Sequence, residues 1–207
     1  ARPGGAMILH RPVGLEELIL VYRTGLRRFP PRLPDQPIFY PVLNFGYAEQ
    51  IARDWNTRSG SFAGYVTEFE VDDAYVRQFE VQTVGAREHQ ELWVPALALE
   101  EFNDHLVGTI RVVGAYFGPA FEGAQGRSAR AQFESLSAAV RADRAMDVQA
   151  AVIGNHEAVF AHFPYWAQGV EGGALGPAGR TVLSAVQAAW SRAFPSIPVG
   201  LETRSGS

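Results

Sequence analysis

A 207-residue chain with a formal net charge of −4 is long enough for one large domain or two small ones. Its composition, 47% hydrophobic and 19% charged, excludes a disordered chain and predicts a packed core. The absence of cysteine excludes disulfides, zinc–thiolate sites and cysteine nucleophiles.

All 18 basic residues are arginine, which also excludes a P-loop lysine and lysine Schiff-base chemistry. No basic stripe with interleaved aromatic residues is present, so duplex nucleic acid is a poor candidate partner. No apolar run reaches the ~18 residues that span a bilayer, and the opening ARPGGA does not resemble a signal peptide. We therefore expect a cytoplasmic protein that makes no use of a membrane.

The chain begins with a short predicted strand and a predicted helix. Residues 7–10 (MILH) form an apolar run that we expect Pro12 and Gly14 to end. From Leu15 onward, apolar residues recur at positions i, i+3, i+4 and i+7, which is typical of a helix with one buried face. Gly25 is well placed to end that helix.

From residue 26 to residue 117, predicted strands and helices alternate. Four prolines in residues 29–37 predict a loop, and IFYPVL (38–43) predicts a short strand. Asn44 is a candidate N-cap for a second helix. Three strands, a short helix and a further strand are then predicted at residues 65–71, 79–84, 89–94, 97–106 and 109–117.

The composition changes after Phe117. A glycine-rich stretch at residues 118–127 precedes an alanine-rich region with helical patterning. We predict an α+β domain over residues 7–117 and a helical extension over residues 118–200. The helices of the extension are expected at roughly residues 127–145, 148–163 and 180–193, with Trp166 and Trp190 packing among them.

The segment HQELWVP (89–95) has an unusual pattern for a strand. Because side chains alternate along a strand, His89, Glu91 and Trp93 share one face. A face that mixes charged and aromatic residues is not typical of a core. Glu91 either points into a functional site, or is an edge charge that discourages pairing with other strands.

Three sequence features occur in an order that resembles a known superfamily. They are a first strand ending in His10, an aromatic strand containing Phe39 and Tyr40 and followed by a helix (YAEQIA), and a late strand in which Glu91 precedes apolar residues. Residues 7–117 resemble the ADP-ribosyltransferase superfamily, in its His–Tyr–Glu branch of poly(ADP-ribose) polymerases and related bacterial toxins. They also resemble bacterial proteins of the ADP-ribosylation/crystallin J1 group. The resemblance implies a split β-sheet core.

The resemblance also implies roles for individual residues, with NAD+ as the substrate. His10 would hydrogen-bond the adenosine ribose, and Arg11 could meet a phosphate. Either Tyr40 or Phe39 would stack on nicotinamide; they face opposite sides of a strand, and Tyr40 is favoured because its hydroxyl adds a polar function. Glu91 would hydrogen-bond the 2′-hydroxyl of the nicotinamide ribose, where positive charge develops as the bond to nicotinamide breaks.

One departure from the family bears on the acceptor. The arginine-modifying branch carries a glutamate two residues before the catalytic one, and His89 occupies that position here. We therefore do not expect arginine as the acceptor and assign His89 a substrate-orienting role. No metal is expected, because His156 and His162 do not have the i, i+4 spacing of a helical metal pair.

Each of these residues also has an ordinary structural interpretation. A histidine at a strand end, core aromatic residues and a solvated arginine need no function. The functional hypotheses are an ADP-ribosyltransferase with an unknown acceptor, such as a bacterial toxin, or an NAD+ glycohydrolase. The alternatives are a module that binds NAD+ or ADP-ribose without turnover, and a protein that docks a partner or a second copy through its helical extension.

Overall fold

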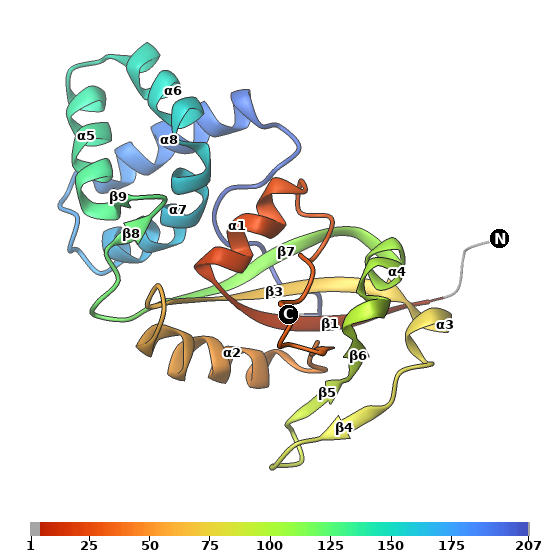
Figure 1. Ribbon diagram of the computed structural model, residues 1–207. Helices are drawn as coiled ribbons and strands as arrows, with labels where there is room; N and C mark the ends of the chain where they lie inside the picture. Colours follow the sequence, from red (N-terminus) through yellow and green to blue (C-terminus); the bar gives the residue numbers. More distant parts are fainter. Residues whose placement is uncertain (1–4, 207) are drawn as a thin grey trace. The chain divides into compact units, whose positions relative to one another are not determined.

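The computed structural model describes residues 5–206, which form two compact units (Figure 1). Unit 1 comprises the chain up to Pro119 together with the residues from Glu202 onward, and unit 2 comprises Ala120–Leu201. The sequence did not predict the return of the C-terminal segment to unit 1. Residues 1–4, on which part of the signal-peptide expectation rests, lie outside the described residues. Within residues 5–206, no helix is long and apolar enough to cross a membrane.

Unit 1 is built on small antiparallel sheets, so the expected α+β class is confirmed. Its main sheet has the strand order β1-β3-β7, and two further pairs are β2 with β6 and β4 with β5. The strand bounds are β1 Ala6–Gly14, β2 Ile38–Phe39, β3 Ala63–Asp72, β4 Val81–Thr83, β5 Gln90–Leu92, β6 Val94–Pro95 and β7 Leu106–Phe117.

The first strand does not end at Pro12, contrary to the sequence prediction. It continues to Gly14 and pairs with β3 along its whole length. The reason lies in the edge that Pro12 faces. His10 exchanges both backbone hydrogen bonds with Val42, on the side away from β3. The missing N–H of Pro12, two residues on, faces that same side and removes no hydrogen bond from the β1–β3 ladder.

Two helices cover opposite faces of the main sheet. The predicted first helix is α1 (Leu15–Arg23), and Gly25 follows it with φ +71°. Asn44 caps α2 (Phe45–Asp54) as predicted, because its side chain accepts a hydrogen bond from the Tyr47 amide. Alternation along β1 directs Arg11 toward Glu17 of α1 and His10 toward Phe45 of α2.

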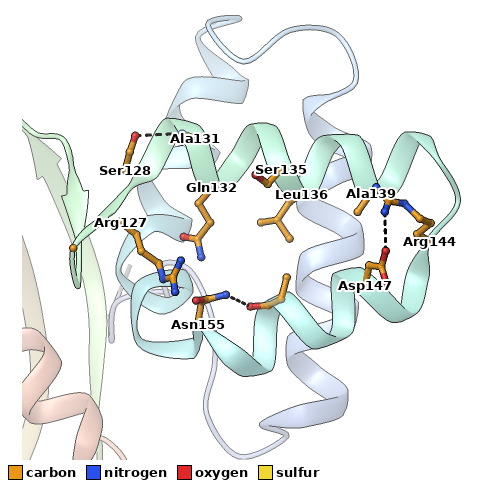
Figure 2. A pocket seen from close by; sticks show the side chains of 12 residues that line it. Arg127, Ser128, Ala131, Gln132, Ser135, Leu136, Ala139, Arg144, Asp147 and Asn155 are labelled. Carbon is orange, nitrogen blue, oxygen red and sulfur yellow. Dashed lines mark hydrogen bonds and ion pairs between the residues drawn. The ribbon is translucent and has the colours of Figure 1, made fainter.

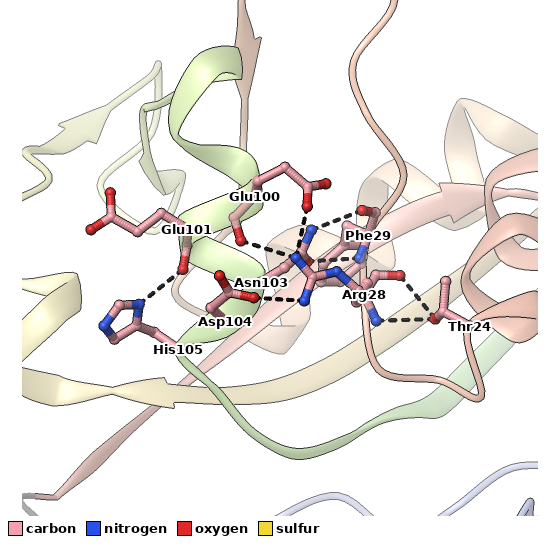
Figure 3. A network of polar contacts seen from close by, with 8 residues as sticks. All are labelled: Thr24, Arg28, Phe29, Glu100, Glu101, Asn103, Asp104 and His105. Atoms are coloured by element: carbon pink, nitrogen blue, oxygen red, sulfur yellow. Dashed lines mark hydrogen bonds and ion pairs between the residues drawn. The ribbon is translucent and has the colours of Figure 1, made fainter.

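The α1 face carries an aromatic core and a polar network that holds the segment after α1 in place. Phe29, Phe39 and Phe102 are fully buried and in ring contact. The Asn103 side chain accepts from the Phe29 amide at 2.8 Å and donates to the Phe29 carbonyl at 3.0 Å. Arg28 pairs with Glu100 and Asp104 (Figure 3). The remaining elements of unit 1 are α3 Asp73–Val76, α4 Leu99–Asp104 and the 3₁₀ turns Asn56–Arg58 and Ala96–Ala98.

Unit 2 contains four helices where the sequence predicted three. The predicted helix over residues 148–163 is divided at Asn155, because Gly154 and Asn155 are poor helix formers and Asn155 instead caps the carbonyl of Ala151. The next helix then continues past Pro164. Trp166 and Trp190 are buried. The bounds are α5 Ala129–Arg141, α6 Ala145–Gly154, α7 His156–Glu171 and α8 Gly179–Ala193, with a short β8–β9 pair at Gly123–Ala124 and Arg127–Ser128.

His162 of α7 is a fully buried histidine whose hydrogen bonds define its tautomer. The Ala124 amide donates to Nε2 at 2.7 Å, so Nε2 carries a lone pair and the proton is on Nδ1. Nδ1 lies 2.7 Å from Gln132 Oε1 and donates to it. Burial lowers the pKa of His162 to about 4. The imidazole is therefore a neutral structural link between α5, α7 and the β8 strand.

The close approach of α2 to β3 generates a first prediction. A Cβ atom at Gly64 would lie 2.2 Å from the Ala52 carbonyl oxygen. We expect Gly64→Ala to destabilise unit 1 by about 1–3 kcal/mol or more, because backbone would have to move. Gly46→Ala is the control, since its Cβ would meet nothing nearer than 3.8 Å and alanine favours a helix. Hydrogen exchange of the β3 amides measures the stability of unit 1 in both variants. Equal protection in the two variants would contradict the close packing of α2 on β3.

A second prediction concerns pH. The pKa of His162 is lowered in the folded state, so its contribution to stability is complete above about 6.5 and is lost as pH falls toward about 4. We expect acidification over this window to cost up to about 3 kcal/mol through His162 alone. Urea denaturation at pH 7 and pH 4.5 measures the free energy of unfolding. Its decrease on acidification should be smaller for His162→Gln than for the wild type. The same loss in both proteins would contradict the assignment.

Candidate functional site

One row of side chains crosses unit 1 on the face that α2 covers. Strand register places Arg111 of β7 opposite Glu68 of β3, and Glu68 opposite His10 of β1. Two isolated bridges continue the row from His10 to Val42 and from Val42 to Glu91. Residues directly opposite each other on neighbouring strands point to the same side. The predicted histidine and glutamate therefore share one face, two strand spacings or roughly 10 Å apart.

His10 is buried within this row. Its Nε2 lies 3.0 Å from Glu68 Oε2, and its ring meets Phe45 edge-on at 6.0 Å between centroids. Its Nδ1 is buried and has no hydrogen-bond partner among residues 5–206. When Nε2–H donates to Glu68, Nδ1 is left as an acceptor without a donor. An unsatisfied buried nitrogen is costly, so this atom is the one in the row that a ligand could satisfy.

Glu68 is the hub of the row, with a side chain that is 1% exposed. Its carboxylate accepts from His10, from Arg111 and from the backbone amide of Ser205, the last at 2.9 Å. Arg111 also donates to the Ser205 hydroxyl at 2.5 Å. The segment Glu202–Gly206 therefore lies over this end of the row, where Arg204 stacks above the Phe45 ring at 4.1 Å.

The pKa values of both titrating groups in this cluster, His10 and Glu68, are lowered. Burial lowers the pKa of His10, and this outweighs the opposing hydrogen bond and charge of Glu68. Burial by itself would raise the pKa of Glu68, but hydrogen bonds from Ser205 and His10 and the charge of Arg111 lower it. The row thus favours a neutral imidazole beside an ionised carboxylate at neutral pH.

Glu91 lies at the other end of the row and is also buried, at 9% exposure. Trp93 Nε1 donates to Glu91 Oε1 at 2.8 Å, and the Tyr47 hydroxyl makes a longer contact of 3.4 Å to Oε2. Burial, with the charge of Glu91, raises the pKa of Tyr47. Glu91 is therefore buried among polar and aromatic groups, which disfavours its interpretation as an edge charge.

His89 belongs to the same group of side chains. Its ring stacks on Tyr47 at 4.4 Å between centroids, and its Nε2 lies 3.1 Å from Gln50 Oε1. Trp93 does not turn into the core as its position suggested, because it is 41% exposed and its indole N–H is directed to Glu91. The alternation of HQELWVP holds: Trp93 contacts the Glu91 carboxylate directly, and His89 is connected to it through Tyr47.

The structure separates the other predicted site residues. Arg11 and Phe39 lie on the α1 face, opposite to His10 and Glu91, because strand alternation turns neighbouring residues apart. Arg11 pairs with Glu17 at 2.6 Å and stacks over the Phe39 ring. Phe39 is a core aromatic residue. Both are engaged on the α1 face and neither joins the row.

Tyr40 lies closer to the row than Phe39 does. It is half-buried and meets Trp93 edge-on at 6.1 Å between ring centroids. Trp93 in turn contacts Glu91. Tyr40 is therefore connected to the glutamate end of the row through one aromatic neighbour.

Sequence reasoning missed three residues that complete the arrangement, namely Glu68, Phe45 and Tyr47. Glu68 gave little signal, because alternation along the YVTEFEV strand (65–71) groups it with Glu70 on the face opposite Tyr65 and Phe69, which is typical of a solvent-exposed face. Phe45 gave no signal of function, because helical periodicity assigned it to a buried stripe. Tyr47 gave no signal either. Among the described residues, no group of three His, Asp or Glu side chains is arranged as a metal site.

Comparison of the chain with protein-family models, with curated proteins and with solved structures finds no match. Any function must therefore be argued from the geometry of the row and from the resemblance in its residue order.

The buried Glu68 generates a third prediction. Glu68→Gln removes the charge that Arg111 and the Ser205 amide face, and we expect unit 1 to lose about 3 kcal/mol. Glu70→Gln, on the same strand face, should change stability by less than about 0.5 kcal/mol. Native-state hydrogen exchange of β1 and β3 amides measures both variants. Equal effects of the two substitutions would show that Glu68 is not the hub.

Proposed function

We propose that unit 1 is an NAD+-dependent ADP-ribosyltransferase in which Glu91 is the catalytic carboxylate. The observation that carries the proposal is the row itself: His10 and Glu91 lie on one face with Val42 between them. The resemblance in residue order requires the histidine and the glutamate to serve one ligand, and the two bridges support this by placing both residues on one face. NAD+ is the proposed substrate, and the cytoplasmic location expected from the sequence is part of the proposal.

The reaction breaks the glycosidic bond between C1′ of the ribose and nicotinamide. Nicotinamide leaves with the bonding electron pair, positive charge builds on the ribose, and a nucleophile on the acceptor bonds C1′ and loses its proton. A fixed carboxylate contributes most where that charge develops. Glu91 is held for this purpose by the Trp93 N–H and the Tyr47 hydroxyl, which fix the positions of both carboxylate oxygens.

The other end of the row supports a role for His10 in ribose binding. Its unpartnered Nδ1 is a buried acceptor, and a ribose hydroxyl would donate the missing hydrogen bond. In the described structure the segment Glu202–Gly206 packs at this end, through Ser205 on Glu68 and Arg204 on Phe45. Binding at Nδ1 would therefore be coupled to movement of this segment.

Aromatic side chains around Glu91 support nicotinamide binding. Tyr40 remains the proposed stacking residue, since it lies beside Trp93, whereas Phe39 is removed from consideration by its burial on the opposite face. His89, stacked on Tyr47, is the proposed substrate-orienting residue on the acceptor side. The acceptor is unassigned, and water as acceptor would make the protein an NAD+ glycohydrolase.

A second candidate is a module that binds NAD+ or ADP-ribose without turnover. Glu91 already accepts a hydrogen bond on each of its carboxylate oxygens. This favours the module, because a ribose hydroxyl would have to compete with Trp93 and Tyr47 for those oxygens. Calorimetry with NAD+ separates the candidates. Binding that Glu91→Ala leaves unchanged, with no nicotinamide released, would support the module.

The fourth prediction tests catalysis by Glu91. We expect nicotinamide release from NAD+ to fall about 100-fold or more in Glu91→Gln, because the amide cannot offer a charge to the developing cation. Glu88→Gln, an exposed carboxyl three residues away, is the matched control and should retain the wild-type rate. The rate is measured by chromatography of nicotinamide with protein, nucleic-acid and small-molecule acceptors present in turn.

Two results would contradict the enzymatic proposal. One is an equal rate of release for the wild type and Glu91→Gln. The other is no release by either protein with any acceptor class or with water.

A further inference from the structure

Unit 2 contains a cavity that the proposed function of unit 1 does not use. It lies between α5 and α6 and has a volume of about 430 Å³, which is within the range of small-molecule sites. Figure 2 shows its lining: polar side chains gather at the end near Arg127, and Leu136 lies along its length. Ala139 and Ala151 complete an apolar floor.

The residues that line the cavity carry a net formal charge of +1. Three charged residues line it, and two of them neutralise each other, since Arg144 pairs with Asp147 at 3.0 Å. The third is Arg127, whose guanidinium points into the space near Gln132 and Asn155 (Figure 2). Within residues 5–206, the Arg127 guanidinium forms no ion pair and no side-chain hydrogen bond. Its donors are therefore available to an anion.

The buried His162 determines which end of Gln132 is available to the cavity. His162 Nδ1–H donates to Gln132 Oε1, as the tautomer argument requires. The Gln132 carbonyl oxygen is thereby occupied, and its NH₂ group remains as a donor. Asn155 is oriented in the opposite sense, because its NH₂ group donates to the Ala151 carbonyl at 2.9 Å and its oxygen is left as an acceptor.

We propose that this cavity binds a small organic anion. The guanidinium of Arg127 and the amide NH₂ of Gln132 hold its carboxylate or phosphate group. The Asn155 oxygen accepts a hydrogen bond from a hydroxyl or amine of the same molecule. The apolar part of the ligand covers Leu136, Ala139 and Ala151. His162 is a positioning residue, which acts through Gln132. The proposal does not depend on the activity of unit 1.

The test is an NMR titration of the full chain, observing the Gln132 side-chain amide and the Arg127 Nε–H. The probes are inorganic phosphate, butyl phosphate, acetate and pentanoate. We expect saturable shifts of both signals, with each alkyl probe binding about tenfold more tightly than its short counterpart because its chain covers the apolar floor. If the phosphate probes bind more tightly than the carboxylate probes, the anionic group of the ligand is a phosphate; the reverse order of affinity identifies a carboxylate.

Two variants locate the site. Arg127→Gln should weaken butyl phosphate binding by about tenfold or more, as expected for loss of a charge-assisted contact. Arg130→Gln is the control, because Arg130 is an exposed arginine at the start of α5, three residues after Arg127, and pairs with Glu134 outside the cavity. Equal weakening in both variants, an affinity independent of the alkyl chain, or no saturable binding in the millimolar range would each overturn the proposal.

Discussion

The buried carboxylate of Glu68 is the interaction on which unit 1 depends. A carboxylate with 1% exposure is tolerated only when charge and hydrogen bonds surround it, and here they come from β1, β7 and the C-terminal segment. Neighbouring strands supply two of these partners in register, so the cluster ties all three strands of the main sheet together. It also explains why residues 202–206 return to unit 1 after the chain has passed through unit 2.

The same constraint shapes the candidate site. Glu68 engages Nε2 of His10 and leaves Nδ1 as the buried acceptor that a ribose hydroxyl could satisfy. The row then passes through Val42, which packs with α2 in a small apolar cluster. Val42 separates two polar ends, one centred on Glu68 and one on Glu91.

Much of the local structure could be predicted because it follows from short-range rules. The helix from Leu15, the Asn44 cap and the shared face of His89, Glu91 and Trp93 depend only on neighbouring residues. One error arose where a distant partner decides the outcome, and another where a local helix-breaking signal was outweighed by the apolar pattern. Pro12 is accommodated because its missing donor faces the side of Val42, and the helix break at Asn155 competes with an apolar pattern that runs through it.

For the site, the sequence alone determined which residues alternate together: His10 apart from Arg11, Tyr40 apart from Phe39, and Glu91 with His89 and Trp93. Side-chain alternation is a property of the strand itself. Only the tertiary structure decided which of those faces meet, because register between strands depends on long-range hydrogen bonds. That register placed His10 and Glu91 in one row, sent Arg11 and Phe39 to the opposite face, and brought in Glu68 and Tyr47.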